Sequence, residues 1–209
     1  PRGHACSGDS PSGSVVARRP LLRFDGRMTD NDTVAGALPV AARELADVLA
    51  GISDAETSRP TPCADFTVAD LLEHLRYWGP GLLAAAPAGP AAADGADLAA
   101  LTERLGEAWG DPASWEGTAS IAGSELPRSM VGRMVLAELV LHGWDLATAM
   151  NPGGGWASSV ADQADDVLSG MAEQGRRMGA FGPEVEVPAS APAMDRALGL
   201  AGRDPAWRP

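Results

Sequence analysis

Two side chains of types that bind metals in proteins, Glu138 and His142, lie four residues apart in a long apolar segment, residues 131–150. In a helix this spacing places both side chains on one face, about one turn apart. The segment is apolar almost all round, which predicts burial on several sides. A buried carboxylate is costly unless it is paired, protonated or bound to a metal. A carboxylate and an imidazole on one face therefore offer two of the three protein ligands of an open zinc-type site, with an ordinary side-chain pair as the alternative.

The chain has three histidines, so the third ligand has few candidates. His4 lies in the N-terminal segment, whereas His74 lies in a second apolar segment with helical spacing. A single histidine in such a segment is more often a satisfied core residue than a ligand. Two inward histidines and one inward carboxylate, on helices that can face each other, leave two interpretations open: a metal site at His74, Glu138 and His142, or satisfied core side chains.

The elements that must position these groups are helices. Apolar spacing and capping signals predict helices over residues 33–50, 68–78, 97–109, 128–150, 158–178 and 193–200. Thr67 and Asp70 form a capping-box pattern at the start of the second helix, and Ser129 is a candidate cap for the fourth. We expect residues 79–95 to be a frayed helix end and a linker. Residues 110–126 are expected to form a loop with a short extended piece near 118–121. Long helices without a run of strands indicate an all-α helical bundle.

Composition narrows the class of protein. The 209 residues are 45% hydrophobic and 21% charged, which is typical of one globular domain. The net charge of -12 argues against binding to nucleic acid or anionic lipid. No apolar run reaches the roughly 18 residues that a membrane helix needs. All 16 basic residues are Arg, so a mechanism through a lysine Schiff base is excluded.

The N-terminal segment differs from the rest of the chain. Residues 1–27 are rich in Gly, Ser, Pro and Arg without a sustained period, and we expect a disordered extension followed by one domain over residues 28–209. The two cysteines, Cys6 and Cys63, are too few for a disulfide scaffold, which makes the cytoplasm the default compartment. Cys63 is expected to be a small packing residue, and a redox or site-edge role is the alternative.

Several segments carry a resemblance to a known family. Residues 61–75, TPCADFTVADLLEHL, resemble the TPCxDWTVxDLLxHL segment of the actinobacterial DinB-like metal-binding proteins. These proteins are grouped with the N-terminal domain of mycothiol-dependent maleylpyruvate isomerase. Residues 137–147, AELVLHGWDLA, resemble the second signature of that family, E-x-x-x-H-G-W-D-L-A. Residues 181–188 and 198–207 resemble its closing segment, so the likeness extends over about residues 32–207.

The resemblance implies a DinB-like four-helix bundle with long crossover connections and a short C-terminal segment. It also implies a divalent metal, usually zinc, held by His74, Glu138 and His142. Two histidines and one carboxylate also suit nickel, iron or manganese. The chain departs from the family at Phe66, where tryptophan is usual, and at residues 76–80, where small residues are usual. The second departure leaves substrate specificity open.

Three protein ligands leave at least one coordination position for water or a thiolate. The enzymes that the chain resembles use mycothiol for isomerisation or S-transfer, which implies a small-molecule thiol and an electrophile as partners. A non-catalytic metal-binding or sensor protein of the same fold is the alternative. A plain structural protein would instead require His74 to lie far from Glu138 and His142. The electrophile, the metal and the choice between monomer and homodimer are not determined by the sequence.

Other residues near the candidate ligands have two interpretations each. Asp145, three residues after His142, could orient that imidazole or be a helix-surface acid. Trp144 is expected in the core or in the wall of a cleft. Arg76 and Arg133 are the basic residues nearest to the ligands in sequence, but solvated or ion-paired roles are more common for arginine than substrate binding.

Overall fold

A computed structural model describes residues 31–64, 66–87, 97–150 and 155–209. The expected disordered extension, residues 1–27, lies outside the described residues, as do His4 and Cys6.

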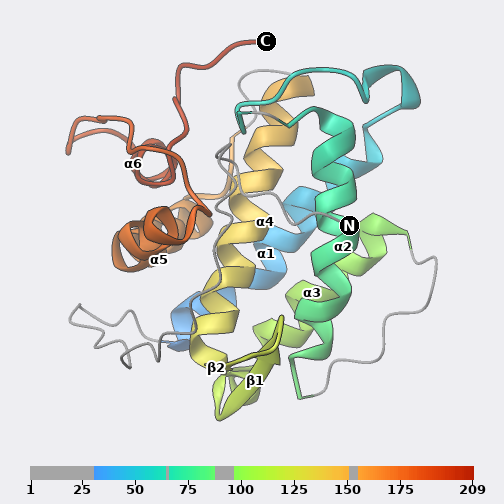
Figure 1. Ribbon diagram of the computed structural model, residues 1–209, viewed down its shortest axis with the longest axis vertical. Coiled ribbons are helices and arrows are strands. Elements are labelled where there is room, and N and C mark those ends of the chain that lie inside the picture. Colours follow the sequence, from blue (N-terminus) through green and yellow to red (C-terminus); the bar gives the residue numbers. More distant parts are fainter. Residues whose placement is uncertain (1–30, 65, 88–96, 151–154) are drawn as a thin grey trace, which may run out of the picture.

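Four long helices form a bundle, and two further helices lie on one side of it (Figure 1). In Figure 1, α4 lies centrally among the bundle helices; α1 packs against α3 and α4, and α2 packs against α3 and α4. Helix α5 packs on α1 and α4, and α6 packs on α5. This arrangement confirms the predicted all-α class. The bundle helices are α1 (Asn31–Ala50), α2 (Val68–Ala84), α3 (Leu98–Gly110) and α4 (Arg128–Met150); the outer helices are α5 (Ser158–Met178) and α6 (Ala193–Leu200).

Helix α4 is the buried centre of the fold, as its apolar sequence predicts. Its buried side chains lie on all faces of the helix and include Leu136, Leu139, Val140 and Leu146. Because most of α4 is enclosed by other elements, any polar group on it must find a partner inside the protein. Among the described residues, no helix is long and apolar enough to cross a membrane.

Helix α2 begins as predicted but ends later. Thr67 and Asp70 form the capping box, with the Thr67 backbone N–H donating to Asp70 Oδ2 at 2.9 Å. The helix then continues through Pro80 to Ala84, so the predicted frayed end over its last turns is wrong. Tertiary packing explains the difference, because Leu83 is fully buried and Trp109 Nε1 donates to the Leu82 carbonyl at 2.9 Å.

A small β-hairpin replaces part of the loop expected before α4. Strands β1 (Thr118–Ile121) and β2 (Ser124–Pro127) pair antiparallel through a two-residue turn, Ala122–Gly123, in which both residues have positive φ. The extended piece over 118–121 was predicted, and the second strand was not. Helix α4 follows directly at Arg128, so Ser129 lies inside the helix rather than capping it. Two short 3-10 helices, η1 (Asp54–Glu56) and η2 (Pro112–Trp115), complete the connections.

Candidate metal centre

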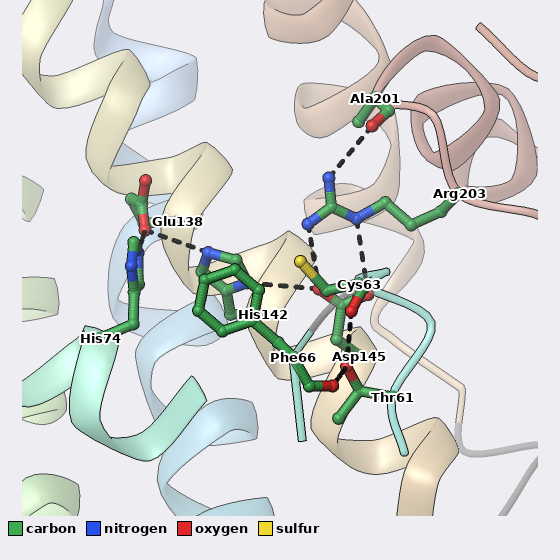
Figure 2. Close-up of polar contacts among 9 residues, drawn as sticks. All are labelled: Thr61, Cys63, Phe66, His74, Glu138, His142, Asp145, Ala201 and Arg203. Carbon is green, nitrogen blue, oxygen red and sulfur yellow. Dashed lines mark hydrogen bonds and ion pairs between the residues drawn. The ribbon is translucent and has the colours of Figure 1, made fainter. Parts of the chain in front are cut away.

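Helices α2 and α4 bring His74, Glu138 and His142 together inside the bundle (Figure 2). His74 Nε2 lies 3.0 Å from Glu138 Oε2, and His142 Nε2 lies 3.3 Å from the same oxygen. The two imidazole rings are 4.7 Å apart between centroids. A plain structural protein would require His74 to lie far from Glu138 and His142, and it does not. That these groups hold a metal stays a prediction.

The spacing of the three groups fits a small cation. Zinc bonds of about 2.0–2.1 Å to nitrogen and oxygen put neighbouring donors of a tetrahedron roughly 3.3 Å apart. The observed separations of 3.0 and 3.3 Å from one carboxylate oxygen to two imidazole nitrogens come close to this value. One donor atom of each of the three side chains lies within 4.8 Å of the others. The donor set, two imidazoles and one carboxylate, matches zinc and its neighbours in the first transition series.

The cluster is partly exposed to solvent. The side chains of His74 and Glu138 are 16% and 34% exposed, whereas His142 is buried. Burial alone would raise the pKa of Glu138, but hydrogen bonds to His142 and His74 outweigh this and hold the pKa well below its usual value. Burial alone would lower the pKa of His142, but contacts to Asp145 and Glu138 raise it to about 9. Without a cation, the cluster is therefore an ionised carboxylate facing a protonated imidazole.

The other nitrogen of His142 faces a buried ion pair. His142 Nδ1 lies 3.2 Å from Asp145 Oδ2, and Arg203 Nη2 donates to the same oxygen at 3.0 Å (Figure 2). Asp145 is fully buried, so the interpretation as a helix-surface acid is wrong. A carboxylate on the non-ligating nitrogen of a histidine fixes the tautomer and orientation of the ring, which is the alternative that the sequence left open.

A second group of possible ligands shares His142. Cys63 Sγ, His142 and Asp145 also lie within 4.8 Å of one another. Cys63 is buried, as the packing interpretation predicts, and its Sγ lies beside His142. Asp145 is already bonded to Arg203. The group with His74 and Glu138 is therefore the better ligand set.

Two cavities lie near these groups. One, of about 20 Å³, is lined mainly by apolar side chains together with Thr102 and Glu138, and has room for about one water molecule. The other, of about 420 Å³, lies between α4, α5 and α6 and includes Trp144 in its wall. Its lining residues include none of the three candidate ligands. Trp144 is thus buried and lines a cavity, but a different one from that beside Glu138.

The remaining residues singled out from the sequence have clear places. Phe66 packs edge-on against the His74 ring, with centroids 6.1 Å apart, so this departure from the family lies beside the candidate site. Arg76 is exposed on α2. Arg133 donates to Asn31 Oδ1 at 2.8 Å and lies over the Trp115 ring, which explains its burial without a substrate.

Sequence reasoning missed Arg203. This residue is 3% exposed and comes from the segment after α6, far from α4 in the sequence. A local signal existed, because Gly202 follows a predicted helix and a glycine at that position commonly turns the chain back on itself. Nothing in the spacing of residues, however, indicates that the next side chain reaches Asp145.

Comparison with known proteins supports the family relationship. Residues 38–95 match the family model described as the mycothiol maleylpyruvate isomerase N-terminal domain. The match covers this part of the chain and agrees with the resemblance of residues 61–75 to that family. The matched range contains His74, whereas Glu138 and His142 lie beyond it. No curated protein matches the chain, and no solved structure does.

Proposed function

We propose that the chain binds one divalent cation through His74, Glu138 and His142, with zinc as the first candidate. We further propose that a remaining coordination position takes a small-molecule thiol. In this role the protein would be a mycothiol-dependent S-transferase or isomerase acting on an electrophilic substrate. The family relationship over residues 38–95 supports the thiol, and the three-residue cluster supports the cation.

One observation carries the proposal: a single carboxylate oxygen, Glu138 Oε2, lies within 3.3 Å of imidazole nitrogens from two different helices. An ion pair needs only one such contact. Two imidazoles converging on one carboxylate, with both His74 and Glu138 partly exposed, leave an accessible face for a further ligand.

The residues of the chain would then have separate roles. His74 and Glu138 lie on the accessible side and would face the incoming thiol, whereas His142 is fixed from behind by Asp145. A bound divalent metal lowers the pKa of a coordinated thiol, so that the thiolate exists at neutral pH. A cytoplasmic location stays a prediction. A thiol cosubstrate would need a reducing compartment.

A non-catalytic metal-binding protein of the same fold is the second candidate. The cavity beside Glu138 favours it, because about 20 Å³ holds a water molecule but not a thiol-bearing sugar. A catalytic role requires that the accessible face over His74 and Glu138, rather than this cavity, receives the thiol.

The test is metal analysis of the full chain purified without chelators, followed by calorimetric titration with mycothiol. Glu73→Gln is a control for the loss of a nearby acidic side chain that is not a candidate ligand. Glu73 is exposed and lies one residue before His74 on the same helix. We expect about one zinc per chain in the wild type and in this control. We also expect heat on adding mycothiol to the zinc-loaded protein and none with the metal-free protein.

Each result separates the candidates. Stoichiometric metal with no response to mycothiol would support the non-catalytic protein. Absence of stoichiometric transition metal in protein never exposed to chelators would overturn both.

A further inference from the structure

The turn after α6 places Arg203 inside the protein. The backbone N–H of Gly202 donates to the Gly199 carbonyl at 3.0 Å, and that of Arg203 donates to the Leu198 carbonyl at 2.9 Å. These two bonds form a Schellman motif, in which the residue after the last helical turn adopts a left-handed conformation. Gly202 has φ of +79°, and a Cβ there would come within 2.9 Å of the Gly182 backbone. The chain therefore reverses at Gly202, and Arg203 enters the core.

Within the core, the Arg203 guanidinium has a fixed set of acceptors. Nη1 donates to the Ala201 carbonyl at 3.0 Å, and Nη2 donates to Asp145 Oδ2 at 3.0 Å. Nε lies 3.4 Å from Asp145 Oδ1, so the guanidinium faces both oxygens of the carboxylate. A guanidinium in this fork-like geometry holds the plane of a carboxylate as well as its position.

The oxygen that Arg203 holds is also the one that faces His142. Asp145 Oδ2 accepts from Arg203 Nη2 and lies 3.2 Å from His142 Nδ1, while Nε2 of the same ring lies 3.3 Å from Glu138 (Figure 2). The contacts thus run in one line from the C-terminal segment, through Asp145, to the ring nitrogen that faces the candidate metal centre.

We propose that Arg203 is a positioning residue for the metal centre. It fixes the Asp145 carboxylate, which keeps the proton of His142 on Nδ1 and leaves the Nε2 lone pair for the cation beside Glu138 and His74. This inference rests on the proposed metal site. It adds that the C-terminal segment, and not only the α2–α4 pair, sets the affinity of that site.

The packing of the C-terminal unit provides a control. Arg196 on α6 forms an ion pair with Asp165 on α5, within the same unit, and among the described residues its hydrogen-bond partners are Asp165 and Ala191 rather than His142 or Asp145. Arg203→Met and Arg196→Met thus each remove one guanidinium from a partner carboxylate. Only the first removes a group linked to the metal centre.

The experiment compares zinc affinity of the wild-type full chain, Arg203→Met and Arg196→Met by competition with a chromogenic zinc chelator. Loss of a group that orients a ligand typically weakens metal binding 10–100-fold. We expect a loss in this range for Arg203→Met and less than a twofold change for Arg196→Met. Histidine nitrogen NMR of the zinc-loaded protein is the second readout. It should show His142 protonated on Nδ1 in the wild type and a mixed or shifted signal in Arg203→Met.

The outcomes distinguish zinc binding at the proposed site from the positioning role of Arg203. A wild type that binds no zinc overturns the proposed function. A wild type that binds zinc, with Arg203→Met equally tight, overturns the positioning role alone, and so does an equal loss in both variants. If Arg203→Met does not fold, Arg203→Lys keeps the charge but not the fork. It should weaken zinc binding by a smaller factor, and unchanged affinity in this variant contradicts the proposal.

Discussion

The two sides of the His142 ring differ in closure. On the Nδ1 side, Asp145 and Arg203 are fully or almost fully buried, and each is bonded to the other. On the Nε2 side, His74 and Glu138 are partly exposed and converge on one oxygen. The first side has the properties of a structural ion pair, which must be satisfied because it is enclosed. The second has the properties of a ligand site, whose donors point at one another and remain accessible. One imidazole can thus belong to the core through one nitrogen and to a ligand site through the other.

The largest expected effect is on metal content. His142→Ala removes the residue that both sides share, and we expect zinc to fall from about one per chain to below about a tenth, because two donors rarely hold zinc at micromolar concentration. Elemental analysis of the purified variant measures this. Full zinc content in the variant would show that the Nε2 side is not the site.

The next effect is on the stability of the metal-free protein. Asp145→Ala removes the carboxylate that neutralises the buried Arg203, and we expect a loss of about 3–5 kcal/mol in the free energy of unfolding. Glu138→Ala removes a partly exposed carboxylate and should cost no more than about 1–2 kcal/mol. Urea unfolding of both variants measures the difference. Equal costs would mean that the two sides do not differ as described.

A smaller effect concerns pH. In metal-free protein the pKa of His142 is raised from 6.5 to about 9, so the stabilisation from its protonated form is complete below about pH 6.5 and is lost as the pH rises towards 9. A shift of this size corresponds to roughly 3 kcal/mol. The lowered pKa of Glu138 has the opposite consequence, because its contribution is lost as the pH falls below its usual value of 4.5.

We therefore expect the metal-free protein to unfold at progressively lower temperature between pH 6.5 and 9. Zinc would take the place of the proton on Nε2 of His142. Saturating zinc should therefore reduce the change in unfolding temperature with pH. Thermal unfolding across that range, with and without zinc, is the measurement. Identical profiles in the two states would argue against zinc at this histidine.

The smallest effect is expected at Cys63. The group that contains Cys63 also needs Asp145, which is bonded to Arg203, so Cys63→Ser should leave the zinc content within about twofold of wild type even if stability falls. Elemental analysis of this variant distinguishes the two ligand groups that share His142, one with His74 and Glu138 and the other with Cys63 and Asp145. A large loss of zinc would instead favour the group with Cys63 and Asp145.

Local signals made much of the fold predictable. The capping box at Thr67 and the bounds of α5 and α6 follow from short-range patterns, and the structure agrees with them. The continuation of α2 through Pro80 was not predictable, because it depends on contacts with α3 that no local pattern encodes. The turn at Ala122–Gly123 was missed for a related reason, since alanine seldom adopts positive φ.

The candidate site shows the same division. His74, Glu138 and His142 could be singled out because their side-chain chemistry is unusual in apolar helices. Arg203 could not, because an arginine after a helix is ordinary until the fold brings it to a buried carboxylate about 58 residues away. The contacts on the Nδ1 side of the His142 ring thus depend on tertiary structure. Most of the residues on the Nε2 side can be identified from the sequence.

X-ray absorption at the zinc edge of the zinc-loaded wild-type protein reports the ligand atoms around the metal itself. We predict two histidine nitrogens and one or more oxygens at about 2.0–2.1 Å, with no sulfur contribution in the absence of added thiol. Loss of one histidine nitrogen from the spectrum of His74→Ala would show that His74, on α2, is a ligand. A sulfur neighbour at about 2.3 Å, or a spectrum unchanged in His74→Ala, would contradict the account.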